Sequence, residues 1–210
     1  MGKDSLAKCR LCRSAGMKLY LRGERCLSDR CAIEVRNFPP GPRRRRGKLT
    51  DFGIHLREKQ IVRRMFGISE RQFRNYFVRA KKAKGVTGES LLSLLERRLD
   101  NVVYRSGLAD SRAQARQLVS HRFFVLNGRV VDRPSVTVKV NDVIEVKPQK
   151  KNKTFFKIKK ENGFNPLPKD FWLTFDEENL RVKVNRLPTR EEMEQNIDEL
   201  LVVEYYSNRI

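Results

Sequence analysis

The sequence predicts an α+β fold with a helical N-terminal domain and a small unit of two helices and a short β-sheet. Apolar residues recur at helical spacing from about Thr50 to Val119. From Phe123 to Val146 they alternate instead, as they do in strands. All four cysteines lie ahead of both regions, within the first 31 residues, which sets the N-terminal segment apart.

Two helices are predicted between about Thr50 and Gly85. The first ends at Gly67 and carries its apolar residues on one stripe, namely Ile54, Ile61 and Met65. The second opens at Ser69 with the pattern of a capping box. Its apolar stripe is rich in aromatic residues: Phe73, Tyr76, Phe77 and Ala80.

Two further helices and two strand pairs are predicted for the small unit. One helix runs from about Glu89 to Arg105, and a short helix follows a second capping box at Ser111. The dipeptide Asn127-Gly128 tolerates the positive φ of a two-residue type I′ turn, so residues 123–126 and 129–131 are expected to form a hairpin. A second pair, residues 136–140 and 144–146, flanks Asn141-Asp142.

The net charge of the chain is +21, from 46 Lys and Arg against 25 Asp and Glu. Such an excess repels itself unless a polyanion neutralises it, and a phosphate backbone is the natural partner. No apolar run approaches the roughly 20 residues that a membrane-spanning helix needs, and the first ten residues lack the apolar core of a signal peptide. We therefore expect a cytosolic protein with no membrane and no small-molecule substrate as partner.

The cysteines form two close pairs, Cys9-x2-Cys12 and Cys26-x4-Cys31. Two such pairs separated by a loop suit a tetrahedral four-thiolate zinc site, which is closed and structural rather than catalytic. An iron-sulfur cluster uses the same ligands and stays an alternative. Two disulfides are the other alternative, which the reducing cytosol disfavours.

Candidate RNA-binding residues are basic side chains that lie away from the apolar stripes, together with an arginine block after Pro39-Pro40-Gly41. In the N-terminal domain they are Arg43, Arg44, Arg45, Arg46, Lys48, Arg57, Lys59, Arg63, Arg64, Arg71, Arg74, Lys81 and Lys82. In the small unit they are Arg98, Arg105, Arg112 and Arg116, with His121 and Arg122 ahead of the hairpin. The alternative for Arg98 and Arg105 is pairing with Glu96 or Asp100 within the unit itself.

The chain divides by composition into four segments. Residues 1–48 form the cysteine-bearing segment and a basic linker, residues 49–94 the helical domain, residues 95–160 the small module, and residues 161–186 a connection of unassigned structure. From Leu187 onward there are 2 basic and 6 acidic residues, a net charge of −4, and the β-prone run from Leu200 to Tyr206. We expect this tail, residues 187–210, to pack back on the basic helical domain.

Several runs of the sequence closely resemble the bacterial small-subunit ribosomal protein four family, in its zinc-binding four-cysteine form. They are LERRLDNVVYR from Leu95 to Arg105, SRAQARQLV from Ser111 to Val119, and Val125 with Asn127-Gly128. GISERQFR from Gly67 to Arg74, the cysteine spacing, Leu19-Tyr20-Leu21, Pro39-Pro40-Gly41 and the terminal Glu204-Tyr205-Tyr206-Ser207 are similar to the same family. The chain departs from it at Pro42-Arg43-Arg44 and at His121-Arg122-Phe123.

The resemblance implies a non-enzymatic constituent of the small ribosomal subunit. Such proteins bind the five-way junction in the 5′ domain of 16S ribosomal RNA, nucleate assembly of the subunit body and contribute to translational accuracy. The implied partners are 16S ribosomal RNA, the neighbouring small-subunit proteins numbers five and twelve, and, as a further candidate, messenger RNA near the entry channel. The implied location is the cytoplasm, bound to the ribosome.

Two rival functions are open to the same residues. An RNA-modifying enzyme is one, because the module at 95–148 also resembles modules appended to pseudouridine synthases, but no segment is left to supply a catalytic domain. His55 and His121 stand apart from any nucleophile or carboxylate constellation in the sequence. A zinc-dependent DNA-binding factor is the other, since four-cysteine knuckles and basic helices also serve there.

Overall fold

The computed structural model describes residues 7–42, 48–164, 166–168, 170–207 and 209. It divides into two compact units. Unit 1 comprises residues 1–92 and 194–210, and unit 2 comprises residues 93–193. The structure is therefore mixed, with helices throughout and one small antiparallel sheet in unit 2.

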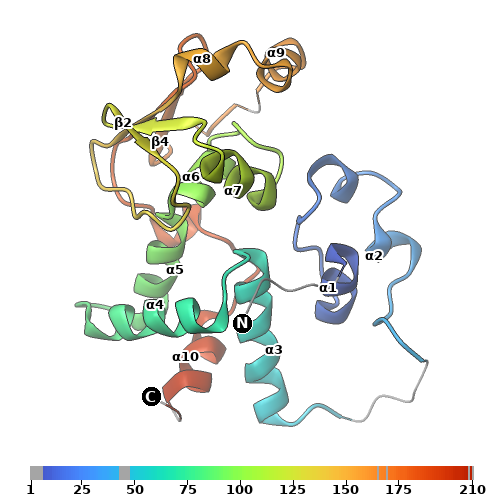
Figure 1. Ribbon diagram of the computed structural model, residues 1–210. Coiled ribbons are helices and arrows are strands. Elements are labelled where there is room, and N and C mark those ends of the chain that lie inside the picture. The colour runs from blue at the N-terminus through green and yellow to red at the C-terminus, as the bar shows by residue number, and fades with distance from the viewer. Residues whose placement is uncertain (1–6, 43–47, 165, 169, 208, 210) are drawn as a thin grey trace. The chain divides into compact units, whose positions relative to one another are not determined.

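Unit 1 is helical in its described part (Figure 1). Its elements are α1 (Lys8–Ala15), η1 (Gly23–Cys26), α2 (Ala32–Val35), α3 (Asp51–Met65), α4 (Glu70–Lys82), the first part of α5 (Thr87–Glu96), and α10 (Glu199–Ser207). The hydroxyl of Thr50 accepts from the Gly53 N–H at the start of α3, and that of Ser69 accepts from the Gln72 N–H at the start of α4. The N-cap predicted at Ser69 is thus confirmed.

The C-terminal tail is a helix in the structure, so the expected β-prone run is wrong. Asp198 begins α10 by accepting from the N–H groups of Leu200 and Leu201. Val202, Tyr205 and Tyr206 are buried at helical spacing. Tyr206 stacks on Phe77 with 4.8 Å between ring centroids, so α10 packs on the helices of unit 1 that carry the core. Capping and these contacts outweigh the strand preference of valine and tyrosine.

Unit 2 holds a five-stranded antiparallel sheet in the order β2-β1-β3-β5-β4. The strands are β1 (Phe124–Leu126), β2 (Arg129–Val131), β3 (Val143–Val146), β4 (Leu173–Asp176) and β5 (Arg181–Val184). The helical elements are α6 (Leu99–Arg105), α7 (Arg112–Ser120), α8 (Pro148–Lys151), α9 (Thr154–Glu161) and η2 (Arg190–Glu192), with the end of α5. The hairpin at Asn127-Gly128 is confirmed, and both residues have positive φ, 48° and 81°.

Three sequence expectations for this unit are corrected. The helix expected from Glu89 to Arg105 is broken, because Arg98 is extended and bridges Thr137. Residues 136–140 are consequently not a strand, and β3 pairs with β1 and β5 instead. The stretch from 161 to 186 is not a mere connection, since it supplies β4 and β5 to the sheet, and fully buried Trp172 immediately precedes β4.

Candidate nucleic-acid interface and cysteine cluster

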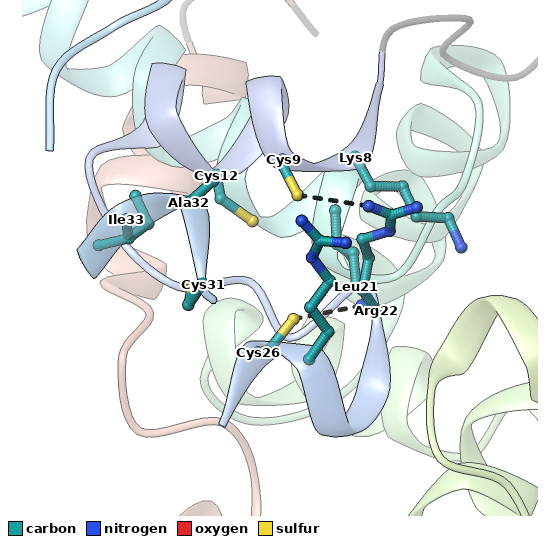
Figure 2. Close-up of a pocket in the computed structure, with 10 residues that line it drawn as sticks. Lys8, Cys9, Cys12, Leu21, Arg22, Cys26, Cys31, Ala32 and Ile33 are labelled. Carbon is teal, nitrogen blue, oxygen red and sulfur yellow. Dashed lines mark hydrogen bonds between the residues drawn. The ribbon is translucent and has the colours of Figure 1, made fainter. Parts of the chain in front are cut away.

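The four cysteines of unit 1 gather around one small cavity. Cys9 and Cys12 lie on α1, Cys26 ends η1, and Cys31 directly precedes α2. All four line a cavity of about 10 Å³, with basic side chains at its edge (Figure 2). That volume is about one water-sized sphere, so the cavity has room for a single atom.

Hydrogen bonds to sulfur prepare this cluster for thiolates. The backbone N–H of Arg22 donates to Cys26 Sγ at 3.3 Å, and its guanidinium Nη1 donates to Cys9 Sγ at 3.9 Å (Figure 2). Burial raises the pKa of the Cys12 thiol, a hydrogen bond from the Leu19 backbone opposes that rise, and the other cysteines add to it. Four thiolates would repel one another here unless a cation lay between them.

The cysteines are all free thiols, so the disulfide alternative is not what the structure shows. Within the described residues, no group of three or more His, Cys, Asp or Glu side chains has the arrangement of a metal site. The structure therefore supports a thiol cluster around a cavity, without the tetrahedral geometry that the spacing predicts.

The outward side of α4 is the most continuous basic surface on one helix of unit 1. Phe73, Tyr76, Phe77 and Ala80 are buried on one side of the helix. Five basic side chains are exposed over about half of its circumference: Arg71, Arg74, Arg79, Lys81 and Lys82. The only acidic residue of the helix, Glu70, is engaged by unit 1 itself, so this surface keeps its whole positive charge.

By contrast, the basic residues of α3 are engaged within unit 1. Lys59 is 3% exposed and donates to Glu70 Oε2 at 2.7 Å, with Arg63 Nε 3.8 Å from the same oxygen. Arg57 donates to the carbonyl of Ala15 at 2.6 Å, and Arg64 to Ser14 Oγ at 2.9 Å. The expected surface position of Lys59 is therefore corrected, because its ammonium balances a buried carboxylate, and this group of residues holds α1 and α4 to α3.

In unit 2, a buried acceptor, Asp100, takes up two of the arginines expected to face RNA. Arg98 is 1% exposed and donates from Nε and Nη2 to the two carboxylate oxygens of Asp100 at 3.0 and 2.9 Å. Arg116 reaches Oδ2 of the same carboxylate from α7, at 2.9 and 2.7 Å. Asp100 therefore ties the start of α6 to α7.

Glu96 is the second buried acceptor of this network. Arg105 grips its carboxylate with two donors at 2.9 and 2.7 Å, and Asn101 donates to it at 2.5 Å. Arg112 is 7% exposed, donates to Asn101 Oδ1 at 2.8 Å, and lies 4.6 Å from the centroid of the Tyr104 ring. The internal pairing considered for Arg98 and Arg105 is thus what the structure shows, and it extends to Arg112 and Arg116.

The remaining candidates are exposed or lie outside the described residues. Lys48 and His121 are exposed, and Arg122 is exposed beside Asp132, which accepts from it at 3.1 Å. The block Arg43, Arg44, Arg45 and Arg46 falls outside the described part of the chain.

Comparison with known proteins decides between the rival functions. Residues 5–96 match the family described as "Ribosomal protein S4/S9 N-terminal domain", and residues 97–144 match the "S4 domain". A protein of Caldicellulosiruptor bescii named "Small ribosomal subunit protein uS4" is 56% identical over 201 residues, 95% of this chain and 96% of that one. The chain belongs to the uS4 family.

Other uS4 proteins match over almost the whole chain. Those of Thermodesulfovibrio yellowstonii and Clostridioides difficile are 50% and 51% identical, each covering 99% of this chain and 100% of its own length. Proteins of the uS4 family are structural and non-enzymatic, and this chain is accordingly no enzyme. No helix in the described parts of the chain is long and apolar enough to cross a membrane.

Sequence reasoning overlooked part of the exposed basic surface of this uS4 protein. Arg79 lies on the exposed side of α4, and its guanidinium is 6.0 Å from the centroid of the Tyr76 ring. Its helical angle relative to Arg71 and Arg74 could have placed it there. The lysines of α8 and α9 were also passed over, because that stretch carries no clear apolar period.

Proposed function

We propose that this chain is a structural constituent of the small ribosomal subunit, cytoplasmic and ribosome-bound, that binds 16S ribosomal RNA. One structural observation supports the RNA-binding part most directly. The outward side of α4 presents Arg71, Arg74, Arg79, Lys81 and Lys82, and its only carboxylate is engaged elsewhere in unit 1. Phosphates attract such a surface, and their neutralisation supplies most of the affinity of basic proteins for RNA.

The RNA target that we propose is the five-way junction of the 5′ domain, with assembly of the subunit body nucleated there. Lys48, Arg57, His121 and Arg122 are exposed and join α4 as contact candidates. Arg105 and Arg116, with 21% and 17% of their side chains exposed, keep an accessible edge beside their carboxylates. Lys59, Arg98 and Arg112 are left out of this surface because they are buried.

A contribution to translational accuracy and contacts with small-subunit proteins numbers five and twelve are part of the same proposal. They rest on family resemblance alone, as does messenger RNA near the entry channel. The arginine block from Arg43 to Arg46 would meet RNA phosphates beside these neighbours, since four adjacent guanidinium groups need counter-ions.

We further propose that Cys9, Cys12, Cys26 and Cys31 hold one zinc ion. The residues fit such an ion in three respects: their thiols are free, they line one atom-sized cavity, and two of the sulfurs already accept hydrogen bonds. Bound zinc would supply a structural cross-link between α1 and α2. Arg22 would orient Cys9 and Cys26 and offset part of the negative charge of four thiolates.

Binding of purified protein to the 5′-domain fragment of 16S ribosomal RNA tests the first proposal. We expect the fragment to bind far more tightly than a DNA duplex of equal length, and we expect affinity to fall steeply with salt. Replacing Arg71, Arg74 and Lys82 by Gln should reduce the slope of log affinity against log salt by about 2 to 3. Equal affinity for RNA and DNA would contradict the proposal.

Metal analysis of the reduced protein tests the zinc proposal. We expect one zinc per chain, lost on Cys26→Ser and retained in the control Ser28→Ala. Chelation should increase proteolysis in residues 7–36 before it affects unit 2. Reduced wild-type protein without stoichiometric metal would refute the site, and stoichiometric iron would assign the iron-sulfur alternative.

A further inference from the structure

The positive charge of unit 2 is concentrated in one segment. Residues 147–161, which we call the lysine lobe, contain seven lysines and one acidic residue, Glu161. Unit 2 as a whole has 21 basic and 13 acidic residues, so the remainder of the unit has 14 and 12, a net charge of only +2. The lobe therefore supplies +6 of the +8 that unit 2 carries.

The lobe is folded and anchored to the core of unit 2. Phe156 on α9 is fully buried, and its ring centroid lies 6.2 Å from that of Phe123 and 5.1 Å from that of Phe155. Lys159 forms an ion pair with Asp110, and Lys150 lies 4.9 Å from the centroid of the Phe123 ring. The lysines of the lobe thus stand on a fixed platform.

Three lysines of the lobe lie in a row on one side of α9. Lys153, Lys157 and Lys160 are exposed at i, i+4 and i+7, which places them on one face at a rise of about 6 and 10 Å from the first. No carboxylate pairs with any of them among the described residues, and Lys160 donates only to the carbonyl of Glu178, at 3.4 Å. This contrasts with the arginines of α6 and α7, whose charge is balanced by Asp100 and Glu96.

Folding stability alone does not account for this row. Lys153 is the N-cap residue of α9, and no acidic residue lies in the first turn, although the positive end of the helix dipole favours acidic residues there. Lysines clustered in so short a segment also repel one another. An external polyanion would relieve both costs.

We propose that the lysine lobe is an RNA-binding surface of unit 2, at which Lys153, Lys157 and Lys160 contact the phosphate backbone without reading the base sequence. Lysine suits this task because its ammonium acts as a mobile point charge on phosphate. The lobe would supplement the arginine-rich module, whose arginines are largely committed to internal pairs. This inference rests on the proposed binding of ribosomal RNA.

The test uses the full chain with Lys153, Lys157 and Lys160 replaced by Gln. In binding to the 5′-domain RNA fragment, the salt slope should fall by about 2 to 3, one phosphate contact for each lysine. The matched control replaces Arg129, Lys139 and Lys183, which are exposed cations of the same unit outside the lobe, by Gln. The control should change the slope by less than about 1, and circular dichroism should show native folds for both variants.

Acetylation of lysines in free and RNA-bound protein gives an independent readout. Lys153, Lys157 and Lys160 should be protected in the complex with RNA alone. An unchanged slope in the lobe variant, an equal change in the control, or protection only in the complete subunit would overturn the inference, the last by assigning the lobe to a protein partner. If wild-type protein fails to bind the RNA at all, the proposed function itself falls and the inference with it.

Discussion

At the scale of single residues, two glutamates of unit 1 show how burial and partners set opposite charge preferences. Burial alone would raise the pKa of Glu70, but hydrogen bonds from Lys59 and from the Tyr206 hydroxyl, the latter at 2.6 Å, outweigh it and lower the pKa. Burial raises the pKa of Glu58, and nearby Asp198 adds to the rise against the opposing charge of Arg57. Glu58 Oε2 is buried and has no hydrogen-bond partner among the described residues.

Glu70→Gln is expected to lower the free energy of unfolding at pH 7 by about 2 kcal/mol, because it removes charged hydrogen bonds to Lys59 and Tyr206. The folded-state pKa of Glu70 is depressed, so its stabilisation is present above the unfolded pKa near 4.5 and is lost as pH falls through the folded value. Urea unfolding at several pH values measures this. A destabilisation of equal size at pH 3 and pH 7 would contradict the assignment.

The same substitution at Glu58 is expected to act in the opposite direction. A raised pKa means that the carboxylate destabilises the folded state once pH rises above the unfolded value, so Glu58→Gln should stabilise the protein at pH 7. The amide oxygen can still accept from the Asp198 backbone. At pH 3 both side chains are neutral and the difference should vanish. Loss of stability at pH 7 would show that the Glu58 charge is compensated in the folded state.

At the scale of elements, the break between α5 and α6 has a physical cause that sequence periodicity does not carry. Arg97 and Arg98 leave the helix and pair with the segment at 136–138, where the Val138 N–H donates to the carbonyl of Arg97 at 2.9 Å and the Leu99 N–H to that of Val136 at 2.8 Å. These partners lie about 40 residues away, so no local pattern announces them. Local signals did predict the caps at Ser69 and Ser111 and the turn at Asn127-Gly128.

The candidate site divides in the same way. The cysteine spacing and the exposed side of α4 were readable from the sequence, since both depend on local order. The burial of Lys59, Arg98 and Arg112 was not, because each is set by an acceptor on another element or across a chain reversal. Runs of the sequence that carry the family resemblance in unit 2 therefore encode its internal charge network as much as an RNA surface.

Arg98→Met is expected to lower the free energy of unfolding of unit 2 by about 3 kcal/mol, because it deprives buried Asp100 of a two-donor partner. Arg116→Met is the matched comparison. It removes a guanidinium from the same carboxylate at a site that is 17% exposed, and should cost less. Denaturant unfolding of both variants measures the order, and a reversed order would assign Asp100 mainly to Arg116.

At the scale of the whole molecule, charge is distributed unevenly relative to its use. Unit 1 carries a net charge of +13 and unit 2 carries +8, while the internal networks around Glu70, Asp100 and Glu96 use only a few of the 46 cations. Most of the positive charge therefore has no internal balance. A uS4 protein of this composition is built to be neutralised by RNA.

The free chain should accordingly be stabilised by screening. Repulsion at a net charge of +21 opposes the compact state, and salt shortens its range from about 30 Å at 0.01 M to about 8 Å at 0.15 M. Salt also weakens the ion pairs, but the innermost, such as Arg98 with Asp100, are buried and screened less. We therefore expect the midpoint of thermal unfolding to rise as potassium chloride increases over this range. We expect a larger rise with a saturating 5′-domain RNA fragment, because binding to the folded state adds its own free energy. A midpoint that falls with salt would mean that exposed ion pairs, rather than unbalanced cations, dominate the electrostatics of the free protein.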